Sequence, residues 1–315
     1  MNSDHDRPVS ASASSLAGLR RPGPPLRLVV GCGYLGERVA RRWVAAGCAV
    51  MATTRREPRA AELKGLGIEP VVVDVTAAQP LWTDLFARVG TPSSVFWGVG
   101  FDRAAGSTHR DVHVGGLQKL LDALAATAPP AAKPRVIFSS STGVWGDDRG
   151  GFVDESTPPN PTRDAGRVLV EAEALLAAHP SGPGTVLRFA GLYGPGRLPR
   201  IVDLAAGMPI AADPDSWLNL IHVDDAAAVV SAVADAAAPR GLYVVSDGRP
   251  IRRRDWYGTL AEVTASPPPR WDPTAARTRG ADKRVDSSLL CRDLGIRMEH
   301  PDAPTAAALL VRGGG

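Results

Sequence analysis

Short apolar runs alternate with amphipathic segments along most of the chain. The runs are rich in valine and other strand-favouring residues, and the segments between them place apolar residues at helical spacing. The pattern predicts strands over 28–30, 48–54, 71–73, 94–97, 135–139, 185–189, 218–223 and 241–246. It predicts helices directly after residue 31, over 109–126, 162–178 and 224–236, near 201–206, and in two later stretches. Strands and helices that alternate at this rhythm indicate a parallel sheet covered on both faces.

The first strand ends in a glycine-rich turn that leads into the first helix. Gly31, Gly33 and Gly36 fit the pattern G-x-G-x-x-G. The first glycine permits the bend, the second lets a pyrophosphate approach the backbone, and the third lets helix pack on strand. The anion then lies at the helix N-terminus. We therefore predict a dinucleotide site, the alternative being a plain strand-to-helix turn that binds nothing. Its expected pyrophosphate contacts are Gly31, Gly33, Tyr34, Leu35 and Gly36.

These elements define the expected fold and domains. The fold class is α/β, a doubly wound parallel sheet of the Rossmann type with a small C-terminal substrate lobe. Residues 1–25 hold no sustained apolar run, so we expect a disordered leader there. The dinucleotide-binding core is expected over 26–192 and the lobe over 193–315, with part of 218–247 returning to the core.

The end of the second strand bears on which dinucleotide is bound. An acidic residue there holds a free ribose 2′-hydroxyl, whereas arginine accepts a 2′-phosphate. The strand ends in Thr54, Arg55 and Arg56 and offers no carboxylate. This favours NADP over NAD; in the alternative, both arginines are ordinary solvated charges.

Two further strand ends belong to the predicted cofactor site. Asp74 follows the third strand, where its carboxylate would either accept from the adenine amine or cap the turn before Pro80. The fourth strand is followed by small residues that would let the backbone run close to a ligand. These are Gly98, Val99 and Gly100.

Composition and charge exclude several classes of function. The 315 residues are 44% hydrophobic, enough to bury a large core. The net charge is +3 with no basic block among aromatics, so nucleic acid is not expected as a partner. Three cysteines without metal or redox spacing indicate reduced thiols and a cytoplasmic location. No apolar run is long enough to cross a membrane.

His109 and His113 stand at a spacing that metal ligands use on one helix face. No third ligand lies nearby in the sequence, and no glutamate follows the first histidine. We therefore expect no metal, and interpret both as surface or helix-packing histidines.

Several motifs together resemble the extended short-chain dehydrogenase/reductases, the nucleotide-sugar epimerase/dehydratase-like group. They are G-C-G-Y-L-G at Gly31, S-S-S-T-G-V-W-G at Ser139, L-R-F-A-G-L-Y-G-P-G-R at Leu187, N-L-I-H-V-D-D at Asn219 and K-R-V-D at Lys283. The glycine spacing departs from the usual G-x-x-G-x-x-G and matches an atypical branch of the group. The resemblance covers nearly everything from residue 26 and implies a nicotinamide cofactor and a small-molecule substrate. It also implies homodimer faces on the helices that begin near residues 109 and 162.

The resemblance assigns roles to particular positions. Ser141, four residues before Trp145, holds the place of the hydroxyl that polarises the substrate; in the alternative the serine-rich turn satisfies its own backbone. The proton-transfer pair Y-x-x-x-K would fall at Ala165 and Leu169, so both members are missing. A positioned acid or base is worth about 10²- to 10⁴-fold, whereas holding hydride donor and acceptor together contributes about 7 to 11 kcal/mol. The loss weakens hydride transfer without forbidding it. Substitute donors are Tyr193, which we name as the candidate, and also His222, Asp164 and Tyr34.

Two functions fit these observations. The first is an NAD(P)-dependent oxidoreductase or epimerase/dehydratase-like enzyme acting on a small carbonyl, imine or sugar-like substrate. The second is a non-catalytic NADP-binding sensor or scaffold, which the missing Tyr/Lys pair favours. The retained Ser141 and the expected substrate lobe favour the enzyme.

Overall fold

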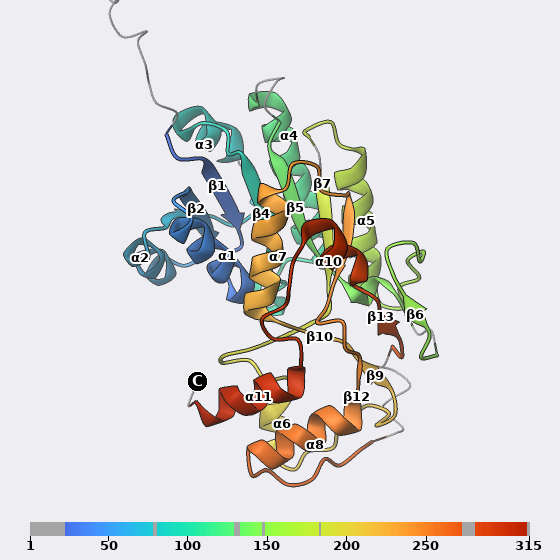
Figure 1. Cartoon of the computed structure of the whole chain (residues 1–315). Helices are drawn as coiled ribbons and strands as arrows, with labels where there is room; N and C mark the ends of the chain where they lie inside the picture. Colours follow the sequence, from blue (N-terminus) through green and yellow to red (C-terminus); the bar gives the residue numbers. More distant parts are fainter. Residues whose placement is uncertain are drawn as a thin grey trace, which may run out of the picture.

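A seven-stranded parallel sheet forms the centre of the molecule (Figure 1). The computed structural model describes residues 23–77, 81–128, 133–146, 149–182, 184–272 and 281–313, so the expected leader over 1–25 lies almost wholly outside them. The strand order is β11-β7-β5-β4-β1-β2-β3. Its strands are β1 Leu26–Val30, β2 Ala49–Thr54, β3 Glu69–Val72, β4 Ser94–Trp97, β5 Arg135–Ser141, β7 Gly184–Phe189 and β11 Leu242–Val245. The expected doubly wound sheet is confirmed.

The central strands are continuous apolar runs because helices cover both of their faces. One face packs against α1 and α7, the other against α3, α4 and α5, and α2 follows β2. The bounds are α1 Tyr34–Ala45, α2 Glu57–Gly65, α3 Leu81–Val89, α4 Leu117–Thr127, α5 Asp164–Ala178 and α7 Val223–Asp235. The predicted helix over 109–126 is wound as a π-helical turn, η2 Asp111–Gly116, followed by α4.

Strand β3 corrects one expectation. The run at residues 71–73 reads as a buried strand, yet β3 is an edge strand and none of its residues is buried. Val72 is 42% exposed. An edge position leaves one side of the strand unpaired, so an apolar run does not by itself imply full burial.

A smaller group of elements lies beyond the strand ends, at the bottom of Figure 1. Six short strands pair there and along the side of the sheet as β8 with β10, β9 with β12 and β6 with β13. They are β6 Phe152–Val153, β8 Gly191–Tyr193, β9 Trp217–Leu218, β10 Leu220–His222, β12 Ile251–Arg252 and β13 Arg284–Val285. The helices of the C-terminal part are α6 Ile201–Ala205, α8 Arg253–Val263, α10 Ser288–Leu294 and α11 Ala303–Arg312.

The C-terminal lobe has an apolar core of its own. Tyr193, Leu204, Trp256 and Leu260 are almost fully buried in it, together with Ala307 of α11. Helix α7 and strand β11, which interrupt the lobe in the sequence, instead pack with the main sheet. The lobe therefore lies beyond the carboxyl ends of the strands of the main sheet, among them β1, β2 and β4 (Figure 1).

Candidate functional site

The glycine loop between β1 and α1 has no room for side chains at two of its three glycines. Gly31 has φ 88°, and a Cβ there would stand 2.6 Å from the Val99 Cα. A Cβ at Gly36 would stand 2.3 Å from the Gly31 carbonyl oxygen. A Cβ at Gly33 would meet nothing within 4 Å. The loop is therefore tightly packed at Gly31 and Gly36 and open at Gly33, where a ligand can approach the backbone.

Hydrogen bonds fix this loop to the neighbouring strand and leave the start of α1 without a cap. The Gly31 N–H donates to Thr53 Oγ1 at 2.8 Å, and the Cys32 N–H donates to the Thr53 carbonyl at 3.0 Å. Gly33 is the N-cap residue of α1 and supplies no side-chain hydrogen bond. The first N–H groups of α1 therefore have no intrahelical acceptor, and an anion can bind them.

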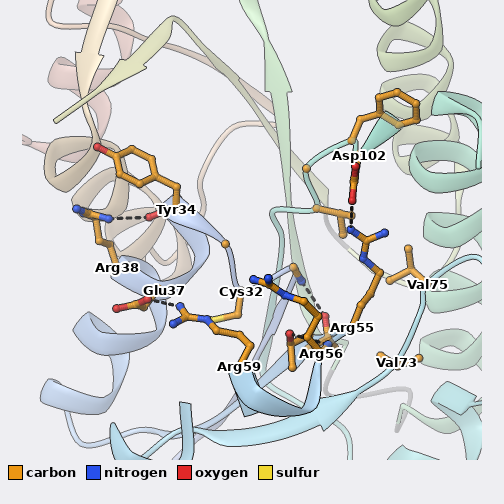
Figure 2. Close-up of a pocket in the computed structure, with 17 residues that line it drawn as sticks. Cys32, Tyr34, Glu37, Arg38, Arg55, Arg56, Arg59, Val73, Val75 and Asp102 are labelled. Carbon is orange, nitrogen blue, oxygen red and sulfur yellow. Dashed lines mark hydrogen bonds and ion pairs between the residues drawn. The ribbon is translucent and has the colours of Figure 1, made fainter. Parts of the chain in front are cut away.

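A cavity of about 550 Å³ opens at this loop (Figure 2). Its wall combines the glycine loop, the end of β2, the start of α2, the segment after β3 and the segment after β4. The lining residues are Gly31, Cys32, Gly33, Tyr34, Glu37, Arg38, Thr53, Thr54, Arg55, Arg56, Arg59, Val73, Val75, Val99, Gly100, Phe101 and Asp102. We call it the cofactor cavity. Of the predicted site residues, those that line it are Gly31, Gly33, Tyr34, Thr54, Arg55, Arg56, Val99 and Gly100. Leu35 and Gly36 are buried in α1 and do not line it.

Four arginines and two carboxylates line the cofactor cavity. Arg55 reaches across it to Asp102, with Nη2 2.7 Å from Oδ2 (Figure 2). Arg59 pairs with Glu37 inside the cavity and with Glu62 outside it, the latter at 2.6 Å. Arg56 is exposed, and its guanidinium has no ion-pair partner among the residues that the structure describes. The excess of positive charge favours an anionic ligand.

Ionisation in the cavity follows from these contacts. Burial opposes the charge on Glu37, but hydrogen bonds from Arg59 and Arg41 outweigh it and lower the pKa. The hydrogen bond from Arg55 lowers the pKa of Asp102. Burial raises the pKa of Cys32 to about 12. Both acids are therefore charged at neutral pH, whereas the thiol is protonated and unreactive.

Asp74 and Gly98 lie next to the cavity without lining it. Asp74 Oδ1 accepts from the Thr76 N–H at 2.8 Å and from the Thr76 hydroxyl at 2.6 Å. These hydrogen bonds lower the pKa of Asp74 and close the turn after β3. The Gly98 N–H donates to the Val30 carbonyl at 2.8 Å, continuing the sheet. A contact between Asp74 and adenine stays a prediction.

Ser141 ends β5 and starts a short 3-10 turn, η3 Thr142–Val144. Its Oγ accepts from the Gly143 N–H at 3.0 Å, so the side chain caps this turn. Helix α5 begins directly against it, because a Cβ at Gly166 would stand 2.7 Å from the Gly143 carbonyl oxygen. Ala165 and Leu169 lie on the first turns of α5. The hydroxyl and the two positions that resemble the proton-transfer pair therefore belong to adjoining segments.

A buried ion pair packs against the end of β5, next to the serine turn formed by Ser141 and η3. Glu173 of α5 and Arg188 of β7 lie 2.6 Å apart, and Ser140 donates to Glu173 at 2.5 Å. The Arg188 guanidinium also stacks over Trp145, 4.7 Å from the ring centroid. These contacts hold β5, α5 and β7 in a fixed relation at the end of the sheet.

The structure places Tyr193 in the core of the C-terminal lobe, and Tyr193 does not line the cofactor cavity. Its ring packs edge-on against His222 and Trp256, at centroid distances of 5.2 Å and 5.6 Å. Its side chain is fully buried, and burial raises the pKa of its hydroxyl well above the ordinary value. These contacts give Tyr193 a packing role, and its role as a proton donor stays a prediction.

Two groups of histidines pack against neighbouring side chains, and each group includes one partly exposed member. His109 stacks on Phe101 at 3.6 Å, and burial lowers the pKa of His113 to about 4. In the second group His222, Asp225 and His300 bring potential ligand atoms within 4.8 Å of one another. The Asp225 oxygens accept from the Glu299 and His300 N–H groups at 2.8 Å and 2.9 Å, so this carboxylate ties α7 to the segment before α11.

Sequence reasoning missed several cavity residues. Glu37 and Arg38 lie on the first turn of α1, and Arg59 lies on α2, which the apolar pattern does not reveal. Asp102 comes from the segment after β4. Their common signal is proximity to a strand end, where side chains meet the ligand crevice in such sheets.

The sheet, the glycine loop and the cavity at the strand ends define the class. The chain belongs to the NAD dependent epimerase/dehydratase family, whose model matches residues 27–246. It is similar to Protein YeeZ of Escherichia coli strain K12, 32% identical over 290 residues that cover 87% of this chain and 96% of that protein. It is also similar to 3-diazoavenalumate denitrifying reductase of Streptomyces sp, 28% identical over 274 residues that cover 80% of this chain and 86% of that protein.

A solved structure shares the whole architecture. A functionally unknown conserved protein from Silicibacter pomeroyi DSS superposes with a TM-score of 0.75 and 27% identity, covering 92% of this chain and 99% of its own. Among the described residues no helix combines the length and apolarity needed to cross a membrane.

Proposed function

We propose that this protein is an NADP-dependent oxidoreductase that acts on a small carbonyl, imine or sugar-like substrate. The observation that carries the proposal is the cofactor cavity, in which an uncapped helix start and four arginines face one open space. The pyrophosphate would contact the N–H groups at the start of α1 above Gly33. When bound, the nicotinamide supplies or takes up the hydride.

The arginines support NADP over NAD. Arg55 and Arg56 follow β2, where the adenosine ribose is held in this fold. Arg55 pairs with Asp102 across the cavity, while the guanidinium of Arg56 has no ion-pair partner among the described residues. A 2′-phosphate would gain charge-assisted hydrogen bonds from both guanidinium groups.

A fluorescence titration of NADPH and NADH tests this assignment. Arg55→Ala removes a hydrogen bond to a charged group, so NADPH should bind at least about ten-fold more weakly while NADH changes little. Arg41→Ala is the matched control, because Arg41 pairs with Glu37 without lining the cavity. Equal losses for both dinucleotides in the Arg55 variant would overturn the NADP assignment.

The end of β5 supports hydride transfer without the usual proton relay. The Ser141 hydroxyl accepts from Gly143 and still has its proton to donate to a substrate atom. The side chains of Ala165 and Leu169 have no ionisable group, so neither can act as a proton donor or acceptor. Among the proposed substrates an imine fits best, since its protonated form accepts a hydride without a further proton. The relative that is named a reductase supports a reduction as the kind of reaction.

A panel of carbonyl, imine and nucleotide-sugar compounds with NADPH separates this enzyme from a second candidate. The absence of an ionisable side chain at Ala165 and Leu169 favours a non-catalytic NADP sensor or scaffold. Tight NADPH binding without turnover across the panel would support the sensor. Turnover of any member supports the enzyme.

The proposal also includes a homodimer and a cytoplasmic location. A homodimer would form through η2, α4 and α5, which lie side by side on one face of the sheet. The cysteines Cys32, Cys48 and Cys291 are free thiols, which supports a cytoplasmic location.

A further inference from the structure

A second cavity, of about 560 Å³, lies in the C-terminal lobe. It is bounded by the loop after β8, by α6, by the end of α8 and by the last turn of α11, which lie together at the bottom of Figure 1. It shares no lining residue with the cofactor cavity. We call it the lobe cavity.

Five of the ten residues that line the lobe cavity are leucine, isoleucine or valine. They are Leu198, Ile201, Val202, Leu310 and Val311. Val202 is 76% exposed, and the neighbouring Leu309 is 64% exposed, so the apolar wall continues onto the surface. Cavities of this volume hold drug-sized ligands, and an apolar wall favours an apolar ligand body.

Arg197 is the charged residue that lines the lobe cavity. Its guanidinium lies over the Tyr34 ring, 5.4 Å from the centroid, and pairs with no carboxylate among the described residues. Nearby arginines differ in this respect, because Arg38 pairs with Asp224 and Arg200 pairs with Asp203. Arg197 therefore keeps its hydrogen-bonding capacity for a ligand.

Two buried polar groups without partners stand next to the same loop. A Cβ at Gly194 would lie 2.8 Å from the Tyr34 hydroxyl and 3.1 Å from His222 Nε2, and neither atom has a hydrogen-bond partner among the described residues. His222 is only 2% exposed. Buried polar atoms are normally satisfied, so these two are exceptions beside Gly194. Neither Tyr34 nor His222 lines the lobe cavity itself, where Arg197 supplies the charge.

We propose that the lobe cavity binds a monocarboxylate with an aliphatic or aromatic body. The carboxylate pairs with Arg197, whose planar guanidinium matches both carboxylate oxygens. The apolar body lies against α6 and the end of α11. The two cavities share no lining residue, although Arg197 lies over the ring of Tyr34, which lines the cofactor cavity.

Calorimetry on the full chain, with octanoate as the probe and 1-octanol as its uncharged match, tests the proposal. Octanoate should bind at one site and more tightly than 1-octanol. Arg197→Met should weaken octanoate by at least about ten-fold and leave 1-octanol unchanged. Arg200→Met is the matched control and should change neither, because Arg200 belongs to the same loop but pairs with Asp203.

A second variant tests the apolar end. Val202→Asp adds a negative charge at an exposed wall position and should weaken both probes. The proposal is overturned if octanoate does not bind, or if Arg197→Met weakens octanoate and 1-octanol equally. It is also overturned if Arg200→Met weakens octanoate as much as Arg197→Met does. Titration of the same samples with NADPH reports the cofactor site separately, so the two proposals fail independently.

Discussion

Replacing Glu173 by glutamine tests whether the buried ion pair holds the serine turn in place. Glu173 is 9% exposed and Arg188 is 4% exposed, and two hydrogen bonds join them, at 2.6 Å and 3.1 Å. Glutamine keeps the size of the side chain but removes its charge. The variant therefore leaves a buried guanidinium without a counter-ion.

The expected loss follows from that burial. Removing one partner of a buried ion pair costs about 3 to 5 kcal/mol. Glutamine can still accept one hydrogen bond from Arg188, so we expect the lower end, about 3 kcal/mol in the free energy of unfolding. For a chain of 315 residues the loss corresponds to a fall in Tm of about 5 °C.

Urea unfolding, followed by tryptophan fluorescence, measures the change. The control is the double variant Glu173→Leu with Arg188→Met, which removes both charges and should be more stable than the single variant. A loss below about 1 kcal/mol in Glu173→Gln would refute the reasoning. So would a double variant as unstable as the single one.

Three further predictions concern the cofactor cavity, the serine turn and the lobe. Asp102→Asn frees Arg55 from its ion pair, so NADPH should bind more tightly in a titration while NADH is unchanged; weaker NADPH binding would contradict this. Ser141→Ala should lower turnover and cost about 1 kcal/mol from the lost cap, with unchanged cofactor affinity; an unchanged rate removes the hydroxyl from the reaction. Burial raises the pKa of Asp247 to about 7, so the folded state keeps a proton that the unfolded chain releases near pH 4. As the pH rises from about 4 to 7, the free energy of unfolding therefore falls by about 1.4 kcal/mol per pH unit. Asp247→Asn lacks this titration, so it should become more stable relative to the wild type over that range. A difference in unfolding free energy that does not change with pH would contradict the prediction.

The main sheet could be predicted from the sequence because its central strands are buried on both faces. Strand β4 coincides with the predicted run, and β1 and β2 agree within two residues. The edge strand β3 and helix α2 follow weaker patterns. Helix α2 buries only Ala60 and Leu63, so its sequence carries little amphipathic signal.

The site was predictable where it depends on the backbone and not where it depends on pairing. The positive φ at Gly31 and the close contact of Gly36 with the Gly31 carbonyl are local, and they leave a glycine pattern that the sequence shows directly. The partner of Arg55 lies 47 residues away, and that of Arg59 lies 22 residues away, so neither pair leaves a local signal. Tyr193 illustrates a different limit of the sequence. A tyrosine at a motif position fits a catalytic role and a packing role equally well, so the sequence does not distinguish the two.

Calorimetric titration of the full chain with NADPH and NADH tests the central claim most directly. Binding of the pyrophosphate at the start of α1 and of the 2′-phosphate at Arg55 and Arg56 predicts one site, with NADPH at least about ten-fold tighter than NADH. Well-folded protein that gives no heat with either dinucleotide would contradict the account.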